Sequence, residues 1–277
     1  MPSKPTMKLL ITLLLLGMFA SNGFAQKQIK IISIKANGKT ILYAENKEAC
    51  PVSLVLKLTL QNMVSNNGSD KVYVIPTNAT HYKLAELQVI KRGVSGFSYR
   101  YKAYFGDVNQ QQNDDNFEYD LPYKKGLQFT VNQGYNGSFS HKNENALDFD
   151  MPIGTEVLAA REGIVVDIVD TNIGACLDES CKTKANYVLL YHADGSFANY
   201  AHIQYHGAKV VVGDIVNKGD VIAFSGNTGF TKGPHLHFVC FLPQIDGRET
   251  LATKFKTGNG NKTEYLKEGN SYKRRYN

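Results

Sequence analysis

The sequence predicts an all-β protein with two domains. After the first 25 residues, short runs in which apolar and polar residues alternate follow one another along the chain, as in half-buried strands. Turns that contain Gly, Asn or Asp separate these runs, and no long helical pattern occurs among them. The 43% apolar and 20% charged residues suit a packed core and exclude collagen-like, low-complexity and highly charged disordered chains.

Residues 1–25 are predicted to be a signal peptide that is removed on export. The apolar run after Lys8 is shorter than the roughly 20 residues that span a bilayer. Gly23 and Ala25 are the small residues expected before a cleavage site at Gln26. An uncleaved N-terminal anchor is the alternative. We therefore expect an exported protein, periplasmic or secreted, with no stable membrane anchor.

The net charge narrows the range of partners. Thirty-one Lys and Arg against 25 Asp and Glu give +6, and removal of Lys4 and Lys8 with the signal leaves 31 − 2 − 25 = +4. This excess is too small to predict a nucleic-acid partner. It would suit an anionic polymer of the cell envelope. No pattern in the sequence specifies an oligomeric state.

The first domain is expected over residues 26–120 as a β-sandwich-like fold, because several short strands at this spacing are typical of a small sandwich. The polar segment 107–116 is predicted to be a linker or long loop. No residue pattern indicates a role for this domain. The runs that predict its strands are 28–34, 40–44, 52–60, 71–75 and 97–105.

The second domain is expected over residues 121–250, again rich in strands. Asp194 and Gly195 separate two strand-like runs and predict a tight hairpin. Residues 251–277 are predicted to be a basic C-terminal tail, solvated at its end, where Lys273, Arg274 and Arg275 stand in sequence.

Four cysteines fall in a chain expected to be exported, where disulfides persist. Cys176 and Cys181 close a short loop and are the favoured pair. Cys50 and Cys240 would then pair by elimination, although nothing in the sequence fixes the distance between them. Four buried free thiols are the alternative.

The segment GPHLHF, residues 233–238, begins a strand that carries two histidines. Because side chains alternate across a strand, His235 and His237 share one face while Leu236 and Phe238 share the other. Adjacent imidazoles leave ring nitrogens that need partners, and metal binding or acid–base chemistry supplies them. A purely structural role for the pair is the alternative.

Three further residues have side chains of the required chemistry. His141 lies in SFSH, and Asp148 lies just before a turn, where its carboxylate can point out of the sheet. Two neutral imidazoles, a carboxylate and an open fourth position form a catalytic zinc arrangement. His202, in NYAHI, can reach the same face as His235, or can be a partly buried residue bonded to the backbone. His81, His192 and His206 lack such a context.

The order of these motifs resembles that of the lysostaphin or LytM-type zinc metallopeptidases, the gly-gly endopeptidase family that cuts peptide cross-links of bacterial cell walls. The resemblance covers about residues 126–243 and includes the separated motifs SFSH, ALDFDMPIGTEV, NYAHI, VIAFSGNTG and GPHLHF. It implies a compact, mostly antiparallel β domain with a groove across its sheet. It also implies that His141, Asp148 and His237 hold Zn2+, while His235 and His202 flank the water on the metal.

The spacing of the first two ligands departs from the family pattern. The family commonly has three residues between the first zinc-binding His and the Asp, whereas six separate His141 from Asp148. Glu144 stands at the usual His position, and zinc accepts carboxylate ligands. We expect His141 to be the ligand, with the loop bulging to absorb the extra residues. Glu144 as a direct ligand is the alternative.

The sequence therefore predicts an exported zinc metalloendopeptidase that hydrolyses the peptide cross-links of peptidoglycan. Zinc makes water available as a nucleophile near neutral pH, His235 would accept its proton, and His202 would stabilise the oxyanion. The alternative is a non-catalytic relative that binds or activates cell-wall hydrolases. A carbohydrate phosphotransfer carrier is a third possibility, but phosphoryl donors are cytoplasmic and export argues against it.

Overall fold

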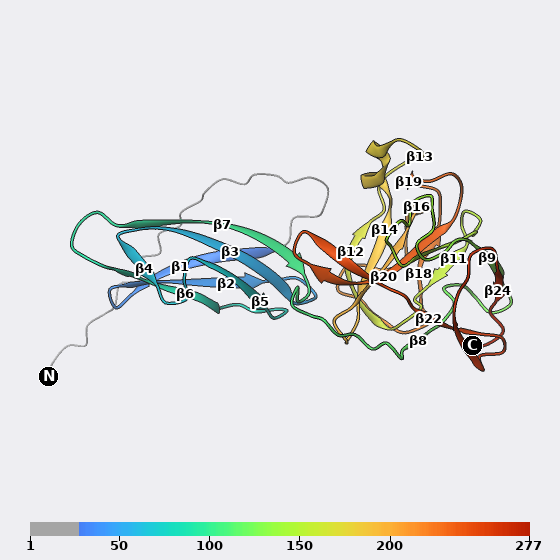
Figure 1. Ribbon diagram of the computed structural model, residues 1–277, viewed down its shortest axis with the longest axis horizontal. Helices are drawn as coiled ribbons and strands as arrows, with labels where there is room; N and C mark the ends of the chain where they lie inside the picture. The colour runs from blue at the N-terminus through green and yellow to red at the C-terminus, as the bar shows by residue number, and fades with distance from the viewer. Residues whose placement is uncertain (1–27) are drawn as a thin grey trace. The chain divides into compact units, whose positions relative to one another are not determined.

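The computed structural model describes residues 28–277, so the predicted signal peptide at 1–25 lies outside the described residues. The described chain is built from strands with one short 3-10 helix, which confirms the all-β prediction (Figure 1). Within this range no helix is long and apolar enough to span a bilayer. The chain divides into two compact units, residues 28–48 with 52–103 and residues 49–51 with 104–277. The segment 107–116, predicted to be a linker, therefore lies inside the second unit rather than between the two.

The first unit contains two sheets, with strand orders β1-β2-β6-β4 and β5-β3-β7. Its strands are β1 (Ile29–Ala36), β2 (Lys39–Asn46), β3 (Val52–Gln61), β4 (Met63–Ser65), β5 (Asp70–Ile75), β6 (Tyr82–Val89) and β7 (Gly96–Phe105). Alternate side chains of both sheets are buried, including Leu42, Leu54 and Leu87. The hydroxyl of Tyr73 on β5 donates to the carbonyl of Leu84 on β6 and so ties the two sheets together.

The second unit is built on one large sheet of order β17-β12-β14-β15-β20-β10-β9-β24, with β21 paired to β20. Smaller sheets join β11-β18-β16, β13-β19 and β23-β22-β8. The elements of this unit are β8 (Glu118–Tyr119), β9 (Gln128–Gln133), β10 (Ala146–Phe149), β11 (Glu156–Leu158), β12 (Gly163–Val169), β13 (Ala175–Cys176), η1 (Glu179–Lys184), β14 (Tyr187–Tyr191), β15 (Phe197–Ala201), β16 (Ile203–Ala208), β17 (Ile215–Val216), β18 (Val221–Ser225), β19 (Gly229–Phe230), β20 (Leu236–Gln244), β21 (Gly247–Leu251), β22 (Lys254–Thr257), β23 (Lys262–Tyr265) and β24 (Ser271–Lys273).

Strand β20 lies in the middle of this sheet, between β10 and β15. Leu236, Phe238 and Cys240 are buried in the main hydrophobic core on one face of the strand. His237 and Phe241 are less buried and belong to the opposite face. The alternation predicted from GPHLHF is therefore confirmed, and the core holds His237 in a fixed register.

The C-terminal residues are not a solvated tail, so that prediction is wrong. Strand β24 pairs antiparallel with β9, and β22 pairs with β23 and β8. Arg274 is only 4% exposed, because its guanidinium group donates to the Asp120 carboxylate at 3.1 Å and to the Leu121 carbonyl at 2.9 Å. The prediction relied on the basic run and overlooked the alternation in which Tyr272 and Arg274 are buried while Ser271 and Lys273 are exposed.

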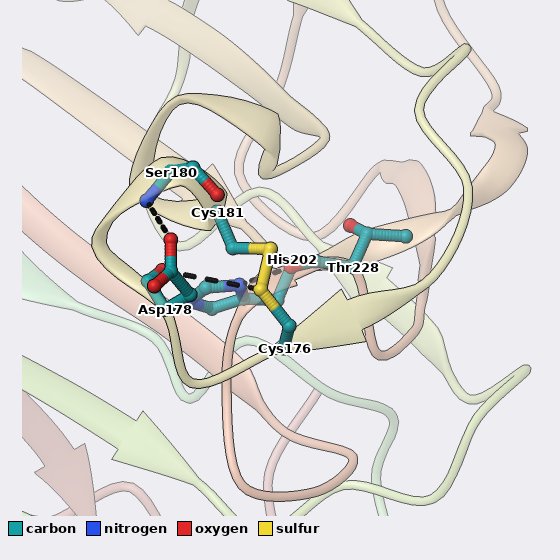
Figure 2. The surroundings of a disulfide bond; sticks show 6 residues. All are labelled: Cys176, Asp178, Ser180, Cys181, His202 and Thr228. Atoms are coloured by element: carbon teal, nitrogen blue, oxygen red, sulfur yellow. Dashed lines mark hydrogen bonds between the residues drawn. A yellow bond between two sulfur atoms is a disulfide. The ribbon is translucent and has the colours of Figure 1, made fainter.

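The predicted disulfide between Cys176 and Cys181 is present (Figure 2). The pairing of Cys50 with Cys240 is wrong, because no disulfide joins these two buried thiols. Cys240 lies in the main core, whereas Cys50 packs in a second cluster with Val166 and Phe197, which Phe241 of β20 also contacts. Opposite faces of β20 therefore separate the two sulfur atoms.

Candidate functional site

Asp148 and His237 stand directly opposite each other on the paired strands β10 and β20. Directly opposed residues of an antiparallel pair point to the same face. The Oδ1 atom of Asp148 lies 2.9 Å from Nδ1 of His237, and Asp148 is buried. Strand pairing in the core thus brings together two residues that lie far apart in the sequence.

His141 reaches this pair from the loop between β9 and β10 and is completely buried. Its Nε2 atom lies 3.2 Å from Nδ1 of His237 and 3.2 Å from Oδ1 of Asp148. The other ring nitrogen, Nδ1, lies 3.0 Å from the carbonyl oxygen of Gly134. Because a carbonyl only accepts hydrogen bonds, Nδ1 of His141 carries the hydrogen, and the lone pair of Nε2 faces the cluster.

Gln133, at the end of β9, holds the loop that carries His141. Its Oε1 atom accepts the backbone N–H groups of Phe139 and Ser140, at 3.1 and 3.2 Å. Its Nε2 atom donates to Ser140 Oγ at 2.8 Å and to Oδ2 of Asp148 at 3.4 Å. A Cβ atom on Gly137 would clash with Cγ of Gln133, so the loop needs glycine there.

Gln133 was not among the residues predicted for the site, although the sequence contains a signal for it. In the run 127–133 the positions 127, 129 and 131 are apolar, and position 133 continues the same face with an amide. A polar group that replaces the expected apolar residue at the end of a buried strand face marks a residue with a hydrogen-bonding role.

The three ligand atoms form a triangle whose size fits a metal ion. Within the described residues, His141, Asp148 and His237 form a group with one ligand atom each, all within 4.8 Å of one another. These atoms are 2.9 to 3.2 Å apart, compared with roughly 3.3 Å between tetrahedral ligands bound about 2.0 to 2.1 Å from zinc. Two imidazole nitrogens and one carboxylate oxygen are also a donor set that zinc accepts.

The electrostatics keep the Asp148 carboxylate charged. Burial alone would raise the pKa of Asp148, but hydrogen bonds from His141 and His237 and the electrostatic effect of the His237 and His235 rings lower it well below its usual range. Burial lowers the pKa of His237 although Asp148 acts to raise it. The lowered pKa favours the neutral ring. For His141, burial works to lower the pKa, but the hydrogen bond and charge of Asp148 outweigh it and raise the pKa.

Glu144 does not belong to the cluster, so the alternative that made it a ligand is wrong. Its carboxylate accepts a hydrogen bond from the Arg248 guanidinium group at 2.9 Å. The backbone N–H of Glu144 donates to the carbonyl of His141, and Asn143 adopts a left-handed φ of 60°. This turn is the bulge that absorbs the three extra residues between His141 and Asp148.

His202 and His235 stand beside the three clustered residues. The ring centroids of His202 and His235 are 4.5 Å apart, and those of His202 and His237 are 5.8 Å apart. Nε2 of His235 lies 3.7 Å from Oδ1 of Asp148. All five residues predicted for the site therefore gather on one face of the large sheet.

The backbone fixes the tautomers of both flanking rings. Nδ1 of His202 lies 2.6 Å from the carbonyl oxygen of Thr228, and Nδ1 of His235 lies 2.8 Å from that of Gly233. Each Nδ1 therefore donates its hydrogen to a carbonyl, and each Nε2 is left to exchange a proton. Burial, aided by the nearby rings of His235 and His237, lowers the pKa of His202 to about 3 and keeps it neutral.

The disulfide-bearing loop supports the segment that contacts both flanking histidines. Strand β13 pairs in parallel with β19, so Cys176 stands opposite Phe230, and the Cys176 carbonyl accepts the Thr231 N–H at 3.3 Å. The Thr231 hydroxyl lies 3.1 Å from Nδ1 of His235. Figure 2 includes His202 and Thr228 among the surroundings of the disulfide and marks their hydrogen bond with a dashed line.

The remaining histidines have other surroundings. His192 is buried, its Nδ1 lies 2.7 Å from the Glu162 carbonyl oxygen, and burial lowers its pKa to about 4. His206 is exposed near Asp170, and His81 packs against Tyr43. None of the three lies in the cluster of His141, Asp148 and His237.

An antiparallel β domain with a His-Asp-His cluster and two adjacent histidines has the composition of a metallohydrolase site. Residues 142–247 match the model of Peptidase family M23. The match contains Asp148, His202, His235 and His237 and begins one residue after His141. The chain therefore contains a domain of peptidase family M23.

Several characterised proteins are similar to this part of the chain. Peptidoglycan DD-endopeptidase ShyA of Vibrio cholerae is 35% identical over 112 residues, which are 40% of this chain and 22% of that protein. Glycyl-glycine endopeptidase ALE-1 of Staphylococcus capitis is 36% identical over 118 residues, which are 42% of this chain and 28% of that protein. The chain thus spans less than a third of the length of these relatives. The solved catalytic domain of lysostaphin from Staphylococcus simulans is 29% identical, with 43% of this chain and 82% of that chain covered and a TM-score of 0.33.

Proposed function

We propose that the protein is an exported zinc metalloendopeptidase that hydrolyses peptide cross-links of bacterial peptidoglycan. The observation that carries this proposal is the triangle of His141 Nε2, Asp148 Oδ1 and His237 Nδ1, with His202 and His235 beside it, in an M23 domain. Relatives named as peptidoglycan and glycyl-glycine endopeptidases support the substrate class. The N-terminal sequence supports export to the periplasm or the medium.

His141, Asp148 and His237 would hold the metal through these three atoms. A zinc ion bound there polarises a carbonyl group and lowers the pKa of water, which is what amide hydrolysis needs. The Gly134 carbonyl keeps the hydrogen of His141 on Nδ1 and thereby keeps Nε2 available. Gln133 orients the second oxygen of Asp148, so that Oδ1 faces the two rings.

His235 would act as the general base. Its Nδ1 hydrogen is held by Gly233, and its Nε2 atom, 3.7 Å from the ligand oxygen of Asp148, accepts the proton of the attacking water. The position of the ring next to the cluster gives this transfer a short path. Upon protonation, the ring can deliver the proton to the leaving amine.

The tautomer of His202 refines the role expected from the sequence. With its Nδ1 hydrogen on Thr228, a neutral His202 presents a lone pair at Nε2 and cannot donate to an oxyanion. It can donate there only in its protonated form, which the lowered pKa disfavours unless negative charge that develops during the reaction stabilises it. We therefore assign His202 to proton transfer during the reaction and to charge stabilisation in its protonated form.

Metal analysis combined with digestion of purified sacculi tests the proposal. The chain without residues 1–25 should bind about one zinc ion, release new amino termini from sacculi and release no new reducing sugar ends. His237→Ala should lose both zinc and activity. New reducing ends would contradict the peptidase assignment. A zinc-bound protein that never cuts, yet binds sacculi or stimulates a cell-wall hydrolase, would instead indicate the non-catalytic relative.

A further inference from the structure

The basic residues of the protein are concentrated in its first unit. Residues 28–48 and 52–103 contain 11 Lys and Arg and 4 Asp and Glu, a net charge of 11 − 4 = +7. Residues 49–51 and 104–277 contain 17 Lys and Arg and 21 Asp and Glu, a net charge of 17 − 21 = −4. The small overall charge therefore conceals a strongly basic unit, and this distribution favours an anionic partner for that unit.

The acidic groups of the first unit are largely used within it. Glu86 binds both Lys39 and Lys83, and Asp70 binds Lys57 at 3.2 Å. Glu48 is buried and accepts the backbone N–H of Gln28. Exposed cations such as Lys91 and Arg92 form no ion pair with a carboxylate of the described chain.

Lys91 and Arg92 stand in the loop between β6 and β7, which also exposes two apolar side chains. Ile90 is 66% exposed and Val94 is 82% exposed. We call residues 90–94 the tip; it lies in the teal loop at the end of the unit where β6 leads into β7 (Figure 1). The paired strands β4 and β6 add Val64 and Val89, also exposed, next to it.

One asparagine holds the tip in a defined conformation. Asn62, in a left-handed conformation between β3 and β4, accepts the Ile90 N–H through its carbonyl at 3.2 Å. Its side-chain amide donates to the carbonyls of Lys91 at 2.8 Å and Val94 at 3.2 Å. Its Oδ1 atom accepts the Lys91 N–H at 3.3 Å. The exposure of Ile90 and Val94 is thus built into a hydrogen-bonded loop.

We infer that the tip is a docking site for an anionic lipid surface. A polyanion in solution would need only Lys91 and Arg92, whereas a bilayer interface also buries Ile90 and Val94. The charge of +7 on the same unit complements anionic headgroups. Two apolar side chains and a few cations give weak, reversible binding, which differs from a stable anchor. The inference does not depend on the proposed peptidase activity.

Vesicle co-sedimentation of the chain without residues 1–25 tests the inference. The protein should bind vesicles of phosphatidylcholine with phosphatidylglycerol, bind phosphatidylcholine alone far less, and dissociate as salt is raised. Each cation near an anionic surface strengthens partitioning about fivefold, so K91Q with R92Q should weaken it about 30-fold. I90S with V94S should weaken it by about tenfold or more.

Matched substitutions in the second unit serve as controls. I173S with V211S removes two side chains of similar exposure, 77% and 66%, and K262Q with K267Q removes two exposed cations. Both control proteins should bind the anionic vesicles like the parent protein. Circular dichroism and thermal unfolding should show that every variant is folded.

Three results would overturn the inference. The first is that the parent protein does not bind the anionic vesicles. The second is binding that the tip variants retain in full or that the control variants also lose. The third is concentration-dependent dimerisation that I90S with V94S abolishes, since a second copy of the chain would then cover the tip.

Discussion

Removal of the disulfide by C176S with C181S should loosen the support of the flanking histidines while leaving the metal ligands in place. The two cysteines are five residues apart and close a loop of about six residues. Closing a loop of this length lowers the conformational entropy of the unfolded chain by roughly 7 cal/mol/K, which stabilises the folded protein by about 2 kcal/mol at 25 °C. In a unit of this size that loss lowers Tm by about 4 to 8 °C.

The effect on activity follows from the hydrogen bonds of the loop. The Cys176 carbonyl accepts the Thr231 N–H, and Thr231 contacts His235, whereas His141, Asp148 and His237 come from β10, β20 and the loop after β9. We therefore expect the variant to keep its zinc and to lose turnover, measured on sacculi in parallel with zinc content. Treatment of the parent protein with a reductant should reproduce this.

Two outcomes would refute this reasoning. If both Tm and turnover stay at the parental values, the disulfide does not stabilise the segment that includes Thr231. If zinc is lost together with turnover, the loop supports the metal cluster rather than the flanking rings. C50S with C240S is not a suitable control, because both cysteines lie in hydrophobic clusters. S180A, at an exposed position of η1, is a suitable control.

Three further predictions concern the cluster itself. His237→Ala should lose zinc, whereas His235→Ala should keep it and turn over about 10²-fold to 10⁴-fold more slowly, with metal content and sacculus digestion measured on both; the reverse pattern would exchange their roles. Gln133→Ala should weaken zinc affinity by about tenfold to 100-fold in a competition titration with a chelator, because Asp148 and the His141 loop lose an orienting partner, and unchanged affinity would contradict this. In the metal-free folded protein the pKa of His202 is lowered to about 3, whereas in the unfolded chain it is about 6.5. His202 therefore takes up a proton in the unfolded chain at a higher pH than in the folded protein. The free energy of unfolding should be at its full value above about pH 6.5 and should fall as the pH drops toward 3. His202→Gln should make this fall shallower in urea titrations at several pH values, with the remainder due in part to His192, and an identical pH dependence would count against a buried neutral His202.

Local patterns in the sequence were sufficient to predict the features on β20. The alternation of side chains along a strand assigns His237 to one face and Phe238 to the other, and the core enforces that register. The hairpin at Asp194 and Gly195 connects β14 to β15 as expected. These features depend on residues close together in the chain, where periodicity and turn chemistry are informative.

Features that depend on distant parts of the chain could not be predicted. The sequence shows that Cys240 faces the core, but not that Cys50 belongs to a different cluster beyond β20. Gln133 acquires its role only when β9 pairs with β10 and places it beside Asp148. The tautomers of His202 and His235 are set by carbonyl groups of Thr228 and Gly233, which carry no side-chain signal.

Because β24 pairs with β9, the final residues of the chain help to position the loop that carries His141. Asn270 accepts the Val131 N–H through its carbonyl at 3.0 Å, and the Glu268 carboxylate accepts the N–H of Gly134 at 3.0 Å. Gly134 in turn holds His141. The segment that matches the family model ends at residue 247, whereas the compact unit that contains it continues to residue 277. Cutting the chain after residue 247 would leave every candidate ligand in the sequence but would remove β24, the strand that pairs with β9 just before the loop of His141.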